Sequence, residues 1–147
     1  MPSRFKQSII LSSTAAIALL FAGCGESKVA QCNKITKVAN QAAQVSQQEG
    51  KNAQTKKDSA SFKKFASKID EITTELKAIE VKDEKLQGFQ TRFVTVYQDL
   101  SQGLKDTAVA IDKKNAKAIN SILTKMQKTS NDETSLVKEI NSYCTGS

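Results

Sequence analysis

The sequence contains no histidine and no tryptophan, and its one proline is Pro2. Without histidine the chain cannot build His-ligated haem, His-based zinc sites or a nucleophile activated by imidazole. Without proline beyond residue 2, no backbone donor is missing from the rest of the chain, so helices can run long. We therefore expect one helical domain in these 147 residues, with no metal, no cofactor and no enzymatic activity.

The first 24 residues have the pattern of an export signal. Arg4 and Lys6 precede an uncharged, mostly apolar stretch at 9–22, which is too short for a comfortable membrane span. The segment Ala22-Gly23-Cys24 follows, with Phe21 where leucine is usual. It resembles the lipobox of bacterial lipoproteins, in which an aliphatic residue and two small residues precede a cysteine.

The lipobox resemblance implies cleavage after Gly23 and a lipid on Cys24 that holds the protein at a membrane. Gly25, rather than aspartate, makes the periplasmic side of the outer membrane the expected location in a Gram-negative cell. The alternatives are an ordinary cleaved signal with an incidental cysteine, or an uncleaved anchor. The expected organisation is a signal peptide at 1–23, a lipidated tether at 24–30 and a helical domain at 31–147.

Three cysteines are present, and a lipid on Cys24 would leave Cys32 and Cys144. Exported proteins meet an oxidising environment in which a disulfide persists. We therefore predict a Cys32–Cys144 disulfide between the two ends of the mature chain. The alternatives are two free thiols or a metal pair, and the lack of histidine disfavours a metal site.

Apolar residues recur at helical spacing throughout the mature chain. In the segment 62–79 they are spaced 3, 4, 3, 4 and 3 residues apart, which is a heptad pattern. Asp83 and Asn115 are suited to cap the helices that follow them. The predicted helices span residues 28–48, 59–81, 83–111 and 115–144, and a polar segment at 49–58, which includes Gly50, ends the first.

The fourth helix has a polar middle at 129–133, where Ser130 and Glu133 match a capping box and could break it. We favour one continuous helix because the third helix needs a partner of equal length. Short connections make neighbouring helices antiparallel, so the expected fold is an all-α, up-down-up-down four-helix bundle. This topology brings Cys32 and Cys144 to the same end, in agreement with the proposed disulfide.

No catalytic motif is evident in the sequence. Glu71 and Glu75 lie four residues apart, but off the apolar seam, and are interpreted as a solvated face. The sequence has no glycine-rich phosphate loop and no nucleophile elbow. Four phenylalanines fall on helical stripes and are interpreted as core packing rather than a ligand site: Phe62, Phe65, Phe89 and Phe93.

Positive charge is the one distributional feature that suggests a binding role. Cleavage after Gly23 removes two of the 22 basic residues and none of the 15 acidic ones, which leaves a net charge of about +5. In the predicted bundle, lysines gather at the end far from the lipid, whereas Glu80, Asp83 and Glu84 lie at the near end. This basic tip comprises Lys51, Lys56, Lys57, Lys63, Lys64, Lys113, Lys114 and Lys117. It could contact an anionic envelope polymer, lipid head groups or an acidic protein, or it could serve solubility alone.

The leading hypothesis is a membrane-tethered, non-enzymatic module that binds or scaffolds a component of the cell envelope; nucleic acid is not an expected partner. The architecture is similar to the cyanobacterial homologues of the photosystem II extrinsic protein PsbQ, which are lipidated four-helix bundles. That resemblance implies an accessory subunit of a membrane complex, and the chain also resembles small helical lipoproteins of such bacteria. A small-ligand carrier or an enzyme is the third hypothesis, although apolar seams leave little room for a pocket in the bundle core.

Overall fold

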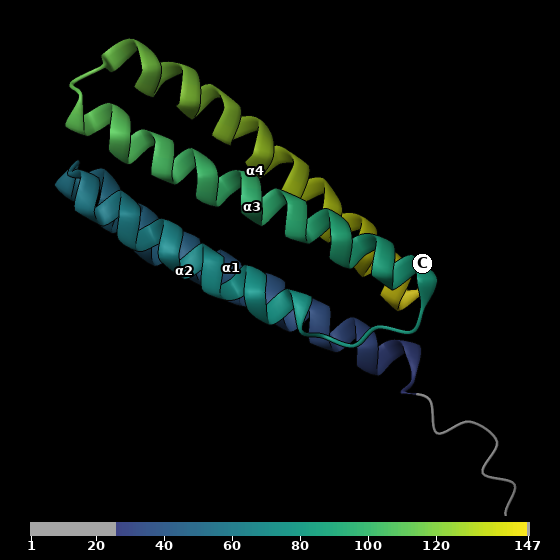
Figure 1. The fold of residues 1–147 in the computed structure, drawn as a ribbon. Helices are drawn as coiled ribbons and strands as arrows, with labels where there is room; N and C mark the ends of the chain where they lie inside the picture. The colour runs from purple at the N-terminus through teal and green to yellow at the C-terminus, as the bar shows by residue number, and fades with distance from the viewer. Residues whose placement is uncertain (1–25, 147) are drawn as a thin grey trace, which may run out of the picture.

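The computed structural model describes residues 26–146, and within this range the chain forms four α-helices and no strand. Each helix packs antiparallel to the next in the chain, so the fold is the expected all-α, up-down-up-down four-helix bundle (Figure 1). The helices are α1 (Lys28–Lys56), α2 (Ser59–Lys77), α3 (Glu84–Asp112) and α4 (Ala116–Thr145). The proposed signal peptide and Cys24 lie outside the described residues.

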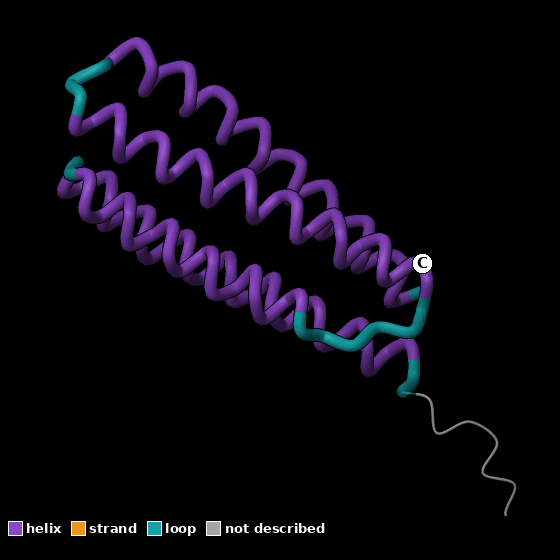
Figure 2. The backbone as a smooth tube through the Cα atoms, viewed as in Figure 1, coloured by secondary structure: helices purple, strands orange, loops and turns teal. Residues whose placement is uncertain are grey.

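The two ends of the bundle differ in what they contain. The α1–α2 and α3–α4 turns lie together at one end, here called the distal end (Figure 2). The α2–α3 linker, the start of α1 and the end of α4 lie at the other, the disulfide end, where Cys32 and Cys144 form a disulfide with their Cα atoms 6.0 Å apart. The expected cysteine pairing is therefore present.

Each helix begins at a polar residue whose side chain accepts a hydrogen bond from a backbone N–H of the first turn. These bonds satisfy one of the amides that a helix N-terminus leaves without a partner. The expected caps Asp83 and Asn115 are confirmed, with bonds of 2.9 and 3.0 Å, and Ser27 and Asp58 cap α1 and α2 in the same way.

The predicted end of the first helix at Gln48 was wrong, because α1 continues through Gly50 to Lys56. An interior glycine costs about 1 kcal/mol relative to alanine. Packing outweighs that cost, since Ala53 is buried and the carboxylate of Glu49 forms an ion pair with Lys64 of α2 at 2.9 Å. The expected loop at 49–58 is therefore only the two residues between α1 and α2.

The predicted end of the second helix at Val81 was also wrong, because α2 stops at Lys77 and an irregular linker follows. Two glutamine side chains satisfy the backbone of this linker. The Gln90 side-chain amide donates to the carbonyls of Leu76 and Ile79, and the Gln31 side-chain oxygen accepts from the N–H groups of residues 82 and 83. These long-range bonds replace the last helical turn.

Helix α4 is continuous over 30 residues, as favoured from the sequence, but its packing is uneven. Only Leu136 and Ile140 are fully buried, and both lie in its second half. It packs extensively on α3 and much less on α1. In the distal half no residue of α4 is fully buried, and a groove separates it from α1, so the side of the bundle between α1 and α4 is open there.

Helices α3 and α4 approach each other closely at Gly103. A Cβ atom added at Gly103 would lie 2.8 Å from Cγ of Met126, closer than real contacts allow. Glycine at this position thus permits the helices to touch near the middle of α4. The main core lies towards the disulfide end of this contact and includes Ile35, Ile69, Leu86, Phe93, Tyr97 and Leu136.

Among the described helices, none has an apolar stretch long enough to cross a membrane.

Candidate functional site

An apolar groove occupies the open side of the bundle at the distal end. Its volume is about 540 Å³, within the range of small-molecule sites in proteins. All four helices contribute to it: the end of α1, the start of α2, the end of α3 and the start of α4. Its apolar wall includes Ala53, Phe62, Ile111, Ile119 and Leu123, and Thr107 also lines it.

The groove is accessible from solvent. Ala53 and Thr107 are each 1% exposed and form its floor, whereas Leu123 is 47% exposed at its edge. Phe62, interpreted from the sequence as core packing, is only partly buried and lines this groove instead. The other three predicted core phenylalanines, Phe65, Phe89 and Phe93, are buried as expected.

Two lysines lie at the rim of the groove in an unusual backbone conformation. Lys57 ends α1 with φ 54°, and Lys114 lies in the α3–α4 turn with φ 51°. This left-handed region costs a residue with a Cβ roughly 1–2 kcal/mol, which is why glycine or asparagine commonly occupies such positions. Neither lysine forms an ion pair with any other described residue.

The other lysines of the predicted basic tip divide into two groups. Lys63 forms an ion pair with Asp112 at 3.1 Å, and Lys64 pairs with the buried carboxylate of Glu49, so these two hold the helices together. The hydrogen bond from Lys64 is the main reason that the pKa of Glu49 lies below its ordinary value.

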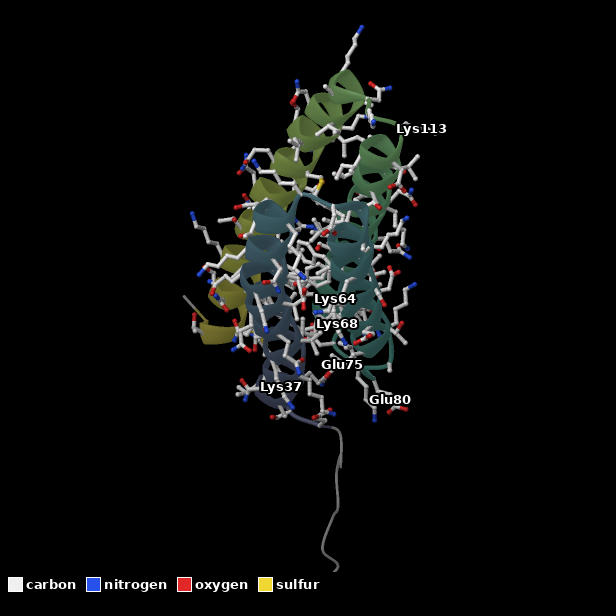
Figure 3. The ribbon with its side chains drawn as sticks, turned by 90° about the vertical axis from the view of Figure 1, so that its left-hand side faces the viewer. Lys37, Lys64, Lys68, Glu75, Glu80 and Lys113 are labelled. Atoms are coloured by element: carbon white, nitrogen blue, oxygen red, sulfur yellow. A yellow bond between two sulfur atoms is a disulfide. The ribbon has the colours of Figure 1, made fainter. Side chains whose placement is uncertain are left out.

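The remaining tip lysines are exposed, and within residues 26–146 no ion pair involves them. They are Lys51, Lys56, Lys113 and Lys117. Lys113 and the acidic Glu80 lie towards opposite ends of the molecule (Figure 3). The structure thus brings the predicted lysines to one end but leaves only some of them free for a partner.

The disulfide end carries charges of both signs. The ammonium groups of Lys28 and Lys85 lie 3.8 and 4.7 Å from the centre of the Tyr143 ring, and the Tyr143 hydroxyl donates to Asp83 at 2.8 Å. This end is therefore mixed rather than simply acidic. An acidic residue, Glu139, lines the pocket beside these lysines, whereas the residues that line the distal groove include no acid.

Titratable groups elsewhere suggest structural roles. Glu71 pairs with Lys68 on the surface and Glu75 is exposed, as expected for a solvated face. Tyr97 is fully buried, and its hydroxyl has no hydrogen bond of good geometry to a described residue. Burial, together with the nearby Glu133 carboxyl, raises the pKa of Tyr97. Burial likewise raises the pKa of Glu133 above its ordinary value.

No group of three or more potential metal ligands occurs among the described residues. The bonded Cys32 and Cys144 serve as a structural link between α1 and α4. Because these helices otherwise pack little on each other, the disulfide closes the bundle at this end while the distal end stays open.

The fold and the sequence together define a helical-bundle lipoprotein with a basic, grooved distal end. Residues 27–143 match the family described as "Uncharacterised lipoprotein PM1805", and the chain belongs to that family. It is therefore a lipoprotein of the cell envelope. No curated protein matches the chain. No solved structure matches it either.

The groove was not predicted from the sequence. Apolar residues recur at helical spacing at the start of α4, yet none of Ile119, Ile122, Leu123 and Met126 is fully buried. The sequence contains no large apolar residue between Met126 and Leu136, and this interruption of the apolar stripe indicates that the two halves of α4 pack differently.

Proposed function

We propose that this protein is a non-enzymatic binding module, held at a membrane by lipid on Cys24, whose distal end binds an anionic component of the envelope. Membership of a lipoprotein family supports the tether. The observation that carries the binding role is the distal end itself, where an apolar groove lies among lysines that have no acidic partner.

The geometry of the bundle suits such a display. Helix α4 has 30 residues, which corresponds to a length of about 45 Å at 1.5 Å per residue. Cys24 lies only eight residues before Cys32 in the sequence, so the disulfide end stays close to the membrane. The distal end then projects about 40 Å away from the anchoring membrane, where a partner can approach it.

The tether is tested by the intact mass of the protein extracted from membranes. We expect a chain that begins at Cys24 and carries two or three acyl chains, and a gain of about 2 Da on reduction as the disulfide opens. A chain without lipid would contradict the tether and the geometry built on it.

Binding is tested by photo-crosslinking in cells. A photoreactive amino acid replaces Lys117 at the distal end or, as the matched control, Lys138 near the disulfide end; both are exposed lysines of α4. We expect a defined crosslinked species from position 117 that is reduced by Lys57→Asn and Lys114→Asn, the two lysines that line the groove. Equal crosslinking from both positions would refute a partner at the distal end.

A further inference from the structure

We infer that the distal groove is a binding site for one acyl chain of a monomeric anionic amphiphile, with Lys57 and Lys114 at its charged head group. The ligand class is a long-chain fatty acid or a single-chain lysophospholipid, which share an alkyl chain that ends at a carboxylate or phosphate. This inference names the ligand of the distal end and so rests on the proposed function.

The wall of the groove matches an alkyl chain. Phe62, Ile111, Ile119 and Leu123 contribute hydrocarbon surface, and no acidic side chain lines the groove. Burial of an alkyl chain against this surface is favourable in proportion to the apolar area that it removes from water. The Leu123 side chain exposes part of this hydrocarbon surface to solvent.

The charges at the rim match an anionic head group. Lys57 and Lys114 come from the two turns of the distal end and both line the groove. The acidic residues of these turns are already engaged: Asp58 caps α2 and Asp112 pairs with Lys63. A ligand carboxylate or phosphate would therefore give these two lysines an ion-pair partner. The charge-assisted hydrogen bonds that it accepts are stronger than those between neutral groups.

The same charges disfavour two other occupants. A second copy of this chain would bring two lysine rims together, and like charges repel. A bilayer surface would need a broad apolar face, whereas the described large apolar residues that are exposed number three, and only Leu123 belongs to the groove. A single chain from a monomeric lipid fits both the volume and the rim.

The test uses the full lipoprotein in its own membranes, to which a diazirine-bearing palmitic acid is added and photolysed. Tandem mass spectrometry then locates the labelled residues. We expect labels at the groove, chiefly within 116–123, and competition by palmitic acid and by lysophosphatidic acid. The uncharged alcohol hexadecanol has the same chain without the anion, and we expect it to compete at least tenfold less well.

Two pairs of variants separate the apolar wall from the charge. Leu123→Glu should abolish labelling, whereas Val109→Glu, at an equally exposed apolar position of α3 outside the groove, should leave it unchanged. Lys57→Asn with Lys114→Asn should reduce labelling at least tenfold. Lys56→Gln with Lys113→Gln, which removes the same charge one residue away, should reduce it less than threefold. Unchanged helical circular dichroism establishes that each variant is folded.

Each outcome decides the inference. Labels spread evenly over the surface, equal competition by hexadecanol, or equal loss in both lysine pairs would overturn it. A crosslinked dimer through 116–123 would assign the groove to a second copy and also overturn it. If the groove stays unlabelled while position 117 still crosslinks a partner, the inference fails and the proposed function stands. If the intact mass shows no lipid at Cys24 but the groove is still labelled, the proposed tether is wrong and the inference about the groove stands.

Discussion

Removal of the Cys32–Cys144 disulfide should cost the bundle about 2–5 kcal/mol of stability. The bond joins residues 112 positions apart, so it closes a loop of 113 residues. In the chain-entropy treatment, a loop of about 100 residues is worth roughly 4.7 kcal/mol, although native disulfides commonly contribute about 2–5 kcal/mol. Because α1 and α4 otherwise pack little on each other, no other contact replaces the link.

The assay is urea denaturation of residues 26–147, which lack Cys24, followed by circular dichroism. With a slope of about 1.5 kcal/mol per M, a loss of about 3 kcal/mol lowers the midpoint by about 2 M. The variant Cys32→Ala/Cys144→Ala removes the bond by mutation, and reduction of the unmodified chain removes it without any mutation. The slope should also rise, because the unfolded chain without the cross-link exposes more surface.

Agreement between the reduced protein and the double variant would show that the bond itself, and not the packing of the sulfur atoms, provides the stability. A shift below about 0.3 M in both would refute the reasoning, since it would mean that the bond constrains the unfolded chain too little to affect stability. A shift in the variant alone would assign the effect to the alanine side chains.

Three further predictions concern the interior and the distal turns. Burial raises the pKa of Glu133, so the folded state binds this proton more tightly than the unfolded state and loses stability as pH rises from the unfolded-state pKa through the folded-state pKa. Glu133→Gln should remove that loss, which denaturation at pH 4, 5, 6 and 7 would detect. An unchanged pH profile in the variant would contradict the prediction. Both Gly103→Ala and Gly88→Ala gain helix propensity, up to about 1 kcal/mol, but an alanine at 103 overlaps Met126 whereas one at 88 has no neighbour within 4 Å. Gly103→Ala should therefore leave the bundle about 1–3 kcal/mol less stable than Gly88→Ala does. Equal effects on the thermal midpoint at the two glycines would refute the close approach. Lys57→Gly should raise stability by about 1 kcal/mol, because it relieves the positive φ, and at the same time weaken acyl-chain labelling; a loss of stability would contradict the strain.

Much of the fold could be predicted because it depends on local chemistry. Helical spacing of apolar residues, the capping residues Asp83 and Asn115 and the absence of proline each act within a few residues, and all are confirmed in the bundle. The failures occurred where distant segments decide the outcome. α1 passes Gly50 because α2 packs against it, and α2 ends early because Gln31 and Gln90 satisfy the linker backbone.

The candidate site could be predicted only in part. Charge and topology together were enough to bring the lysines to one end, because the turns of an antiparallel bundle meet there. They could not show that Lys63 and Lys64 are used in ion pairs between helices, while Lys57 and Lys114 stay available beside an apolar groove. Such pairing depends on side chains that meet across helices, which no local pattern encodes.

The sequence by itself therefore determined the four helices, the caps of two of them, the partner of each cysteine in the described domain and the end at which positive charge collects. Each of these follows from spacing, from backbone hydrogen bonding or from the order of antiparallel elements. Only the tertiary structure decided that the α1–α4 side stays open above the disulfide and exposes a groove. The physical reason is that α4 packs closely on α3, as at Gly103, and packs much less on α1.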